Sequence, residues 1–366
     1  MNHFSKDTKT AIEAKEEAQK IAFGPVIFQA AQSMRKIGLL KVIRDAGKLG
    51  ITISDAAVKS GISEYGARVL MEASLGMGVC TLNDGRYAIT KTGFFLLYDD
   101  LTIANIDFID DVCYNGLGYL QESIETGKPA GLKVFGDWTT IYEGLSSLPP
   151  QVQKSWFAFD HHFSDGSFPL VLAHVLSLGL KKLIDIGGNT GKWAISCVQN
   201  SPDIEVTMMD LPGQLRMAEK KVTEMGLADR IHFHPVNILD EKEQFPHGHD
   251  AIWMSQFLDC FSEAEITSIL KRCYAALDED GYLLILENFW DCQKFAIAAF
   301  SIQMTSLYFT ALANGNSQLY DSVVFKKAVF AAGFSIENQI DYIGEAGHTL
   351  LVCRKASEEA SLQNQK

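Results

Sequence analysis

The sequence lacks the features of a secreted, metal-stapled or membrane-spanning protein. Its seven cysteines stand singly, and no two have the C-x-x-C spacing of a structural zinc site. The first residues, MNHFSKDTKTAIEAKEEAQK, lack the apolar core of a signal peptide. No apolar run reaches the roughly 18 residues that a membrane span needs. These absences argue against a disulfide framework and favour a cytoplasmic protein in a reducing compartment.

Positive charge is also scarce. The chain has 32 Lys and Arg against 45 Asp and Glu, which gives a net charge of −13. Proteins that bind nucleic acids or membrane surfaces through charge are normally basic, so neither partner is expected. What the chain does have is 366 residues, 47% of them apolar, which is enough for one large domain or two ordinary ones.

The N-terminal part predicts a small helical module. Apolar side chains recur at helical spacing within residues 11–47. Ser54 and Ser63 are placed to cap the next two helices. Residues 83–85, Asn-Asp-Gly, predict a hairpin between two short strands. Two helices followed by a hairpin predict a winged helix-turn-helix.

This module is not expected to bind DNA. A helix that enters the major groove should carry several basic or amide side chains. The second helix of the module instead offers Arg68 against Glu64 and Glu72. We therefore expect a packing or dimerisation module.

The composition and the hydrophobic pattern of the sequence change twice after the module. A helical, aromatic-rich stretch predicts a connector, and after it strand-like segments alternate with helical ones. Such alternation predicts a mostly parallel, doubly wound α/β sheet with helices on both faces. The domains expected are 1–100, 101–165 and 166–356, with a disordered tail at 357–366. The strand candidates are KLIDIGG, EVTMMD, IHFHPV, HDAIWMSQF, GYLLILENF and HTLLVCR, and the helix candidates are 190–200, 212–226, 262–277 and 321–332.

The segment LIDIGGNTG places a glycine turn between a strand and a helix. Glycines let the backbone approach a ligand closely in front of a helix N-terminus. The spacing is G-G-x-x-G, with Asn189 where a dinucleotide fingerprint has its second glycine, and no Gly-Lys-Ser/Thr follows as in a P-loop. Asp185, in the strand before the turn, suits a cationic ligand better than a pyrophosphate.

Polar residues also end the next two strand candidates. Asp210 is placed to accept hydrogen bonds from ribose hydroxyls, or alternatively to cap the helix that begins at Pro212. Asn237 could pair with the edge of an adenine, or could be an ordinary turn residue. The sequence leaves both alternatives open.

In this order, LIDIGGNTG, MMDLP, HPVNILD, AIWMSQFLDCFSEAEITSILKR and GYLLILENFW resemble the class I S-adenosylmethionine-dependent methyltransferases. The chain is most similar to the small-molecule O-methyltransferases that carry an N-terminal winged-helix dimerisation domain. The resemblance covers about residues 20–354. It implies a Rossmann-like methyltransferase domain, a homodimer, and S-adenosylmethionine as the cofactor, with S-adenosylhomocysteine as the product.

The resemblance also implies roles for individual residues. The glycine turn would pass close to the methionine part of the cofactor, with Asp185 near its ammonium or sulfonium side. Asp210 would hold the ribose, and Asn237 and Ile238 would flank the adenine. Ser255 stands where many members have a cofactor-contacting lysine. The full set of expected cofactor-binding residues is Asp185, Gly187, Gly188, Asn189, Gly191, Asp210, Leu211, Asn237, Ile238, Ser255 and Gln256.

The family's catalytic signature, His-Asp-Trp before an acidic helix start, is altered in FLDCFSEAE. Phe261 matches the Trp, which puts Asp259 at the position of the His and Cys260 at that of the Asp. Glu287 matches a family acid, whereas Ser317 stands where the family often has Glu. The ordinary pKa of an aspartate, about 3.9, makes it a weak base, but burial could raise that pKa.

Three interpretations of this change stay open. Asp259 is an atypical base or orients the substrate. Alternatively, the acceptor needs no strong base, because methyl transfer depends heavily on alignment. In the third, the protein binds the cofactor without catalysis, as a regulatory protein. A structural alternative for Asp259 is that it caps the helix that follows.

The histidines offer few other candidates. The adjacent His161 and His162 could face the pocket, and we take His162 as the alternative catalytic residue. The histidine pairs at 232/234 and 247/249 have no third ligand at a suitable spacing, so no metal site is expected.

The long apolar stretch 295–315 is typical of a core or dimer-interface helix. The resemblance adds that this region often walls the acceptor pocket. In that case Phe300, Met304 and Tyr308 indicate a flat apolar acceptor. The activity expected is methyl transfer to an oxygen of a small aromatic or polyketide-like molecule.

Overall fold

The computed structural model describes residues 3–357, which form two compact units. The first is Phe4–Val112, and the second begins at Cys113 and also includes His3. The boundary between them falls inside the predicted connector. Residues 358–366, which make up nearly all of the predicted disordered tail, lie outside the described residues.

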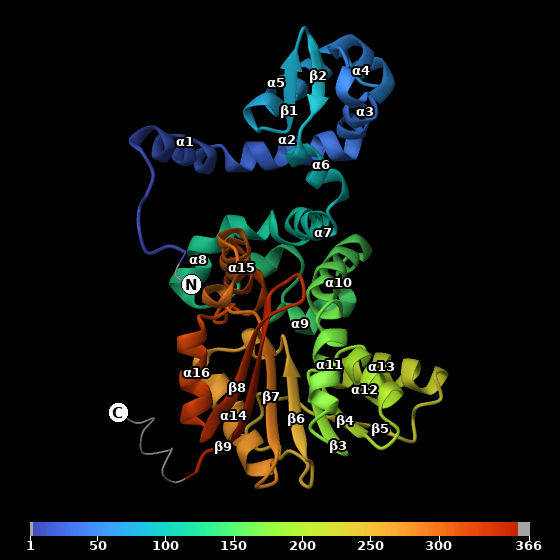
Figure 1. Cartoon of the computed structure of the whole chain (residues 1–366), viewed down its shortest axis with the longest axis vertical. Helices are drawn as coiled ribbons and strands as arrows, with labels where there is room; N and C mark the ends of the chain where they lie inside the picture. Colours follow the sequence, from blue (N-terminus) through green and yellow to red (C-terminus); the bar gives the residue numbers. More distant parts are fainter. Residues whose placement is uncertain (1–2, 358–366) are drawn as a thin grey trace. The chain divides into compact units, whose positions relative to one another are not determined.

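The first unit consists of helices and one hairpin, in the predicted order (Figure 1). Asp84 and Gly85, at the tip of the hairpin, both have positive φ, 48° and 73°, as a two-residue turn of this kind requires. The elements are α1 (Ala11–Ala22), α2 (Gly24–Ile37), α3 (Leu39–Asp45), η1 (Gly47–Leu49), α4 (Ile53–Ser60), α5 (Glu64–Gly76), β1 (Cys80–Asn83), β2 (Arg86–Ile89), α6 (Lys91–Tyr98) and α7 (Asp100–Phe108).

One of the two predicted helix caps is wrong. Thr52, rather than Ser54, caps α4, because the Thr52 side chain accepts a backbone hydrogen bond from the first turn. Ser54 lies inside the helix and donates to Glu64. Ser63 caps α5 as predicted, accepting a hydrogen bond from Gly66 N at 3.0 Å.

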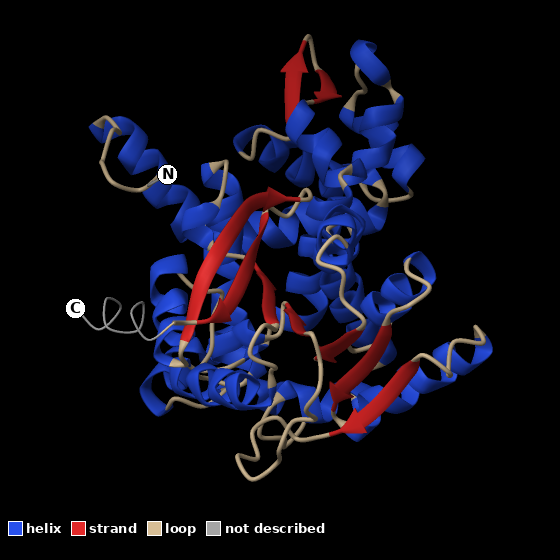
Figure 2. Cartoon of the chain, turned by 60° about the horizontal axis from the view of Figure 1, so that its bottom comes forward, coloured by secondary structure: helices blue, strands red, loops and turns tan. Residues whose placement is uncertain are grey.

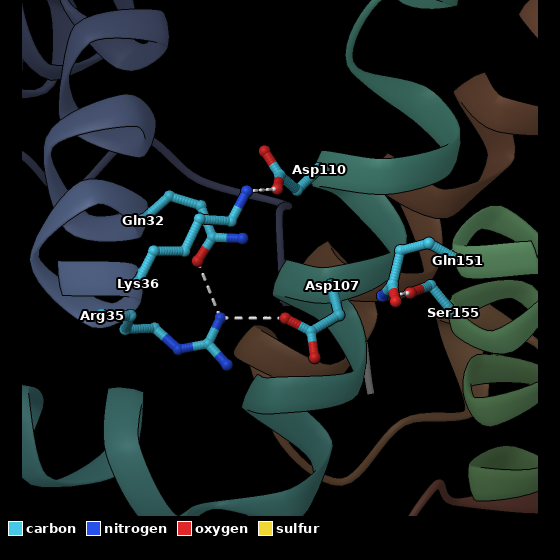
Figure 3. A network of polar contacts seen from close by, with 7 residues as sticks. All are labelled: Gln32, Arg35, Lys36, Asp107, Asp110, Gln151 and Ser155. Atoms are coloured by element: carbon cyan, nitrogen blue, oxygen red, sulfur yellow. Dashed lines mark hydrogen bonds and ion pairs between the residues drawn. The ribbon is translucent and has the colours of Figure 1, made fainter. Parts of the chain in front are cut away.

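Ion pairs connect α2 to the chain in and after α7 within this unit (Figure 3). Arg35 Nη1 donates to Asp107 Oδ1 at 3.0 Å and to Gln32 Oε1 at 2.8 Å. Beside it on α2, Lys36 pairs with Asp110. These charged links hold the last helix of the unit against α2.

The second unit is built on a seven-stranded sheet with the order β5-β4-β3-β6-β7-β9-β8. The strands from β5 to β7 are parallel, and β9 and β8 run antiparallel at one edge. The connection order reverses between β3 and β6, which is where doubly wound sheets bind ligands. The strands are β3 (Lys182–Ile186), β4 (Glu205–Asp210), β5 (Ile231–Pro235), β6 (Ala251–Ser255), β7 (Tyr282–Glu287), β8 (Phe334–Ile343) and β9 (His348–Lys355).

Helices cover both faces of this sheet, which confirms the predicted doubly wound fold (Figures 1 and 2). Side chains of α14 and α16 belong to one core layer, and those of α11, α12 and α13 belong to the other. The helices are α8 (Leu120–Thr126), α9 (Ile141–Gly144), α10 (Pro150–Asp165), α11 (Phe168–Leu176), α12 (Lys192–Asn200), α13 (Pro212–Glu224), α14 (Glu263–Ala276), α15 (Ala296–Tyr308) and α16 (Ser322–Ala331). Short 3-10 or π turns are η2 (Ile109–Cys113), η3 (Gly116–Tyr119), η4 (Ala130–Val134), η5 (Leu145–Ser147), η6 (Leu258–Cys260), η7 (Trp290–Cys292) and η8 (Phe309–Ala313).

Strand β8 was not predicted from the sequence. Its segment FSIENQIDYI has no continuous apolar run, and the register with β9 shifts after Ile336 and again after Ile340. β8 lies at the edge of the sheet, where a strand needs only one apolar face. Because β8 contains polar and charged residues, it does not have the apolar pattern of a buried parallel strand and was not predicted.

The apolar stretch at 295–315 forms α15 and the π-helical turn η8. Together they span 18 residues with a mean hydropathy of 1.4, so the expectation that no run reaches membrane-spanning length is wrong. Core helices of soluble proteins meet the same criterion, and 39% of this span is buried inside the protein. Tyr308 is buried, whereas Phe300 and Met304 are 49% and 45% exposed. Of these three, only Tyr308 therefore lies inside the unit.

Candidate active site

The glycine turn connects β3 to α12 at the switch point of the sheet. Gly187 and Gly191 both have positive φ, 76° and 77°, which a side chain would disfavour. A Cβ on Gly187 would lie 2.2 Å from the ring of Phe257, and one on Gly188 would lie 2.7 Å from Asp185 Oδ2. Glycine is therefore needed here for both conformation and close approach.

Asp210, at the end of β4, holds the glycine turn in place. Its Oδ2 accepts a hydrogen bond from Asn189 N at 3.0 Å, and its Oδ1 accepts one from Leu211 N at 2.7 Å. Burial raises the pKa of Asp210, and these two backbone hydrogen bonds lower it. Helix α13 has Leu211 at its N-cap position, with no side-chain cap. The alternative that Asp210 caps this helix is therefore wrong.

Asp185 is a buried carboxyl group with an unsatisfied oxygen. Its side chain is 2% exposed, and within residues 3–357 its Oδ2 has no hydrogen-bond partner. Burial and, to a smaller extent, the negative charge of Asp210 together raise the pKa of Asp185 to about 8. A cationic ligand group beside Asp185 would reverse this effect, as expected from the sequence.

A cavity of about 80 Å³ lies at this turn. Within the described chain, six of the residues that line it carry a buried polar atom without a hydrogen-bond partner. Such atoms are rare in folded proteins and are completed by an ordered water or by a polar ligand. They are Asp185 Oδ2, Asn189 Oδ1, Trp193 Nε1, Trp253 Nε1, Ser255 Oγ and Gln256 Nε2. They include donors and acceptors, which fits the amino acid end of S-adenosylmethionine.

Two residues at the cavity hold an uncommon backbone conformation. Asn189 and Gln256 both have φ of 47°, although neither is glycine. Strained backbone of this kind concentrates at functional sites. Asn189 is thereby placed to bond Asp210 through its backbone and Asp160 through its side chain.

Of the expected cofactor-binding residues, six line the cavity and five do not. Those that line it are Asp185, Gly187, Gly188, Asn189, Ser255 and Gln256. Those that do not are Gly191, Asp210, Leu211, Asn237 and Ile238. Asn237 Oδ1 accepts a hydrogen bond from Leu239 N at 3.1 Å, which is the turn role left open from the sequence. Ile238 is 8% exposed and packs in the core.

The cavity also includes residues that the sequence did not single out for the cofactor. Helices α10 and α11 contribute Asp160, His161, Ser164 and Phe168, and the indoles come from α12 and β6. His161 lines the cavity, whereas the proposed His162 does not. Trp253 could have been proposed as a cavity residue, because it occupies the position on the neighbouring strand that pairs in register with Asp185. No local pattern links α10 to the glycine turn.

Asp259, at the position of the family histidine, is a buried carboxyl group in the turn η6 after β6. Burial raises its pKa to about 7; the hydrogen bond from Cys260 lowers it, and the charge of Asp160 raises it. Cys260 Sγ donates to Asp259 Oδ1 at 3.4 Å. Helix α14 is capped by Ser262 in a capping box with Glu265, so the alternative that Asp259 caps this helix is wrong.

Glu287 lies beneath this turn at the end of β7. Its Oε1 accepts hydrogen bonds from Phe257 N at 3.1 Å and from Leu258 N at 2.9 Å. Burial raises the pKa of Glu287 well above its usual range, and the charge of Asp259 adds to this. A carboxyl group in this position fixes the backbone that carries Asp259.

The turn is also held from the C-terminal side of the unit. Asn314 Nδ2 donates to Cys260 O, and Ser317 Oγ donates to Asn314 Oδ1 at 2.8 Å. Tyr320 OH donates to Phe261 O at 2.6 Å. Ser317, which stands in place of a family glutamate, therefore supports the turn through Asn314.

The other histidines have structural surroundings. His348 is buried, its Nδ1 lies 2.7 Å from Ser167 Oγ, and burial lowers its pKa to about 4. His249 Nε2 lies 3.2 Å from Thr207 Oγ1. No group of three or more His, Cys, Asp or Glu side chains in residues 3–357 could hold a metal ion.

A doubly wound sheet with a glycine turn and a polar cavity at its switch point has the general form of a Rossmann-like, nucleotide-binding fold. Comparison with known proteins agrees. The model of the Dimerisation2-like domain matches residues 15–87, and that of the O-methyltransferase domain matches residues 160–335. The chain belongs to this O-methyltransferase family and is an S-adenosylmethionine-dependent methyltransferase.

Two curated relatives show the range of the family. The L-tyrosine C(3)-methyltransferase of Streptomyces lavendulae is 27% identical over 92% of this chain and 91% of its own length. The demethylspheroidene O-methyltransferase of Cereibacter sphaeroides is 31% identical over 74% of this chain and 70% of its own length. One relative is thus named for methylation at carbon and the other for methylation at oxygen.

Solved structures have the same fold. The S-adenosylmethionine-dependent methyltransferase SibL, in its apo form, matches with a TM-score of 0.71 at 23% identity, over 92% of this chain and 98% of its own. A second match is an O-methyltransferase from neocarzinostatin biosynthesis, in complex with S-adenosylmethionine and 2-hydroxy-5-methyl naphthoic acid. Its TM-score is 0.65 at 19% identity, over 90% of this chain and 96% of its own.

Proposed function

We propose that the protein methylates a small aromatic or polyketide-like molecule at an oxygen, in the crevice between β3 and β6. The cluster of unsatisfied polar atoms around the cavity is the observation that carries this proposal. Bound there, S-adenosylmethionine supplies an electrophilic methyl group. The glycine turn with Asp185 and Asn189 would hold its methionine part. Asp210 fixes the turn and would bind the ribose.

Asp259 is proposed as the base. It is buried, and its raised pKa of about 7 makes it a better proton acceptor than an ordinary aspartate. When a hydroxyl group of the acceptor attacks the methyl carbon, a carbon–oxygen bond forms and the carbon–sulfur bond breaks. The hydroxyl proton passes to Asp259. Glu287 positions this residue through Phe257 N and Leu258 N.

Aromatic side chains around Asp259 support an aromatic acceptor. The hydroxyl group of Tyr142 and the side chain of Tyr308 are buried beside Cys260, and burial raises the pKa of both hydroxyl groups well above the ordinary value. Trp156 Nε1 donates to Tyr308 OH at 2.8 Å. Two relatives named for naphthoate methylation, from Streptomyces sahachiroi and Streptomyces carzinostaticus, are 26% and 24% identical to this chain.

Methylation at a ring carbon is the second candidate, because a relative that matches 92% of this chain is named as a C(3)-methyltransferase of tyrosine. Removal of a phenolic proton by Asp259 would make the neighbouring ring carbon more nucleophilic. A carbon–carbon bond would then form as the carbon–sulfur bond broke, and the proton of that ring carbon would pass to the phenol oxygen through solvent to restore the aromatic ring. Mass spectrometry of the methylated product distinguishes the two outcomes, since an O-methyl group and a C-methyl group fragment differently.

The first test is calorimetric titration of the purified protein with S-adenosylhomocysteine, with NAD as the comparison. We expect binding of the former only. Turnover is then followed with methyl-labelled S-adenosylmethionine across hydroxylated naphthoates, phenols and tyrosine. Cofactor binding without turnover on any acceptor would contradict the proposed catalysis, and binding of NAD alone would contradict the cofactor site.

The first unit is proposed to form a homodimer in the reducing environment of the cytoplasm. The match to a dimerisation domain supports this, and so do large apolar side chains exposed on α1 and α2. Ile12, Ile21 and Val26 are 72%, 79% and 63% exposed, and α1 has no buried residue. Light scattering coupled to size exclusion should give twice the mass of the chain; a monomer at micromolar concentration would contradict this.

A further inference from the structure

Trp193 and Trp253 form a stacked pair of indoles in the wall of the cavity. Their ring centroids lie 4.0 Å apart, and their planes are 12° from parallel. The side chains are 2% and 0% exposed, and neither indole N–H has a hydrogen-bond partner in the part of the chain that the structure describes. An indole nitrogen can only donate, and a buried donor without a partner is unfavourable. Each indole N–H therefore needs an acceptor, which an ordered water or a bound ligand would supply.

Asp185 stands beside this pair. It is opposite Trp253 in the parallel register of β3 and β6, so the two side chains leave the same face of the sheet. Asp185 Oδ2 is also without a partner in residues 3–357. Three residues that line the cavity thus carry two donors and one acceptor without partners among the described residues. An α-amino acid group offers the complement, a carboxylate that accepts and an ammonium group that donates.

We propose that the indole N–H groups of Trp193 and Trp253 bind the carboxylate of the cofactor's amino acid end, while Asp185 binds its ammonium group. This rests on the proposed function and adds two specificity-determining residues to it. Ser255 stands where many family members have a cofactor-contacting lysine, and its hydroxyl group carries no positive charge. The two indole N–H groups that we propose for the carboxylate are neutral donors.

Lys192 is the competing group for the same carboxylate. It lines the cavity and precedes Trp193 at the start of α12. Consecutive side chains on a helix point about 100° apart, so Lys192 and Trp193 face in different directions from the turn. A variant at each position therefore separates the two possibilities.

The test compares two ligands that differ in the amino acid end. S-adenosylhomocysteine has it, and 5′-methylthioadenosine lacks it. Each is titrated calorimetrically into the wild-type protein and into Trp193→Phe, Trp253→Phe and Lys192→Met. Trp290→Phe, outside the cavity lining, is the matched control. Phenylalanine keeps an aromatic ring and removes the N–H, and melting curves monitored by circular dichroism check that each variant folds.

We expect Trp193→Phe and Trp253→Phe each to bind S-adenosylhomocysteine about tenfold more weakly than the wild type, because each loses a hydrogen bond to a charged group. Affinity for 5′-methylthioadenosine should stay within about twofold of the wild type, as should both affinities of Trp290→Phe. Equal weakening of both ligands would show a packing effect and overturn the inference. The inference would also be overturned if only Lys192→Met lost the preference for S-adenosylhomocysteine over 5′-methylthioadenosine.

A measurement on the wild-type protein guards against variants that fail to fold. S-adenosyl-3-thiopropylamine keeps the amine of S-adenosylhomocysteine and lacks its carboxylate. We expect it to bind at least tenfold more weakly than S-adenosylhomocysteine, and equal affinity would overturn the inference. If the wild-type protein bound none of these nucleosides, the proposed function would fail first, so the two failures are distinguishable.

Discussion

Asn189 Nδ2 donates a hydrogen bond to Asp160 Oδ2 over 3.3 Å, and this contact ties the glycine turn to helix α10. The backbone N–H of the same Asn189 is bonded to Asp210. Asp160 in turn acts on the other side of the site, because its charge raises the pKa of Asp259. The turn that is proposed to hold the methyl donor and the proposed base thus share one neighbour.

Replacement of Asp210 by alanine should remove most of the affinity for the cofactor while the fold survives. Asn189 N and Leu211 N would lose their acceptor, and the glycine turn would no longer be fixed. Loss of hydrogen bonds to a charged group should weaken S-adenosylhomocysteine binding by about tenfold to a hundredfold, measured by calorimetry. Asp203→Ala, at an exposed position just before β4, is the control. Unchanged affinity in Asp210→Ala would show that this acid is misassigned.

Replacement of Asp259 by asparagine should abolish proton transfer and leave the cofactor site intact. General base catalysis typically contributes about 10²–10⁴-fold, so kcat should fall by that factor. The affinity for S-adenosylhomocysteine should stay within about twofold. Glu263→Gln, an exposed acid in the first turn of α14, should retain full activity. A variant Asp259→Asn with near-normal kcat would favour the interpretation that the acceptor needs no strong base.

The pH dependence of the rate should report the ionisation of Asp259. A base works only when deprotonated, and the pKa of Asp259 is about 7, so kcat/KM should rise with pH and level off above this value. Asp160→Asn removes a negative charge that disfavours ionisation of Asp259. The midpoint of the profile should therefore move to lower pH in this variant. A midpoint that stayed in place would mean that Asp160 does not act on the base.

The fold could largely be predicted from the sequence, because the patterns that indicate its strands, helices and hairpin are local. Alternation of apolar strands with helices predicts the parallel part of the sheet, and the Asn-Asp-Gly turn predicts the hairpin. What failed depended on tertiary context. Strand β8 is a polar edge strand that only its pairing with β9 reveals, and Thr52 and Ser54 are equally good caps until the helix start is known.

The candidate site could be predicted from the sequence to a similar extent. Asp185 and the glycines lie within one strand and turn, so their spacing is visible in the sequence. Asp160 and His161 reach the cavity from α10, whose distance from the turn no local pattern encodes. The stacking of Trp193 on Trp253 likewise requires that α12 pack on β6. Contacts between separate elements were thus the part that sequence patterns could not give.

Asp185 should make the protein less stable at high pH in the absence of cofactor. Burial raises its pKa in the folded protein to about 8, far above the value of about 3.9 in the unfolded chain. Its contribution to stability is therefore fully present below the unfolded pKa and is lost as the pH rises through about 8. The loss reaches roughly 6 kcal/mol, at about 1.4 kcal/mol for each unit of pKa difference.

Replacement of Asp185 by asparagine removes this ionisation and should have opposite effects on stability and on binding. At pH 8 the cofactor-free variant should melt at a higher temperature than the wild type, and near pH 4 the two should converge. Affinity for S-adenosylhomocysteine should fall, because a neutral amide cannot pair with an ammonium group. Asp259 and Glu287 also have raised pKa values, but both proteins contain them, so their contribution cancels in the comparison. A variant that melts lower than the wild type at pH 8 would contradict the assignment of Asp185 as a carboxylate kept in place for its ligand.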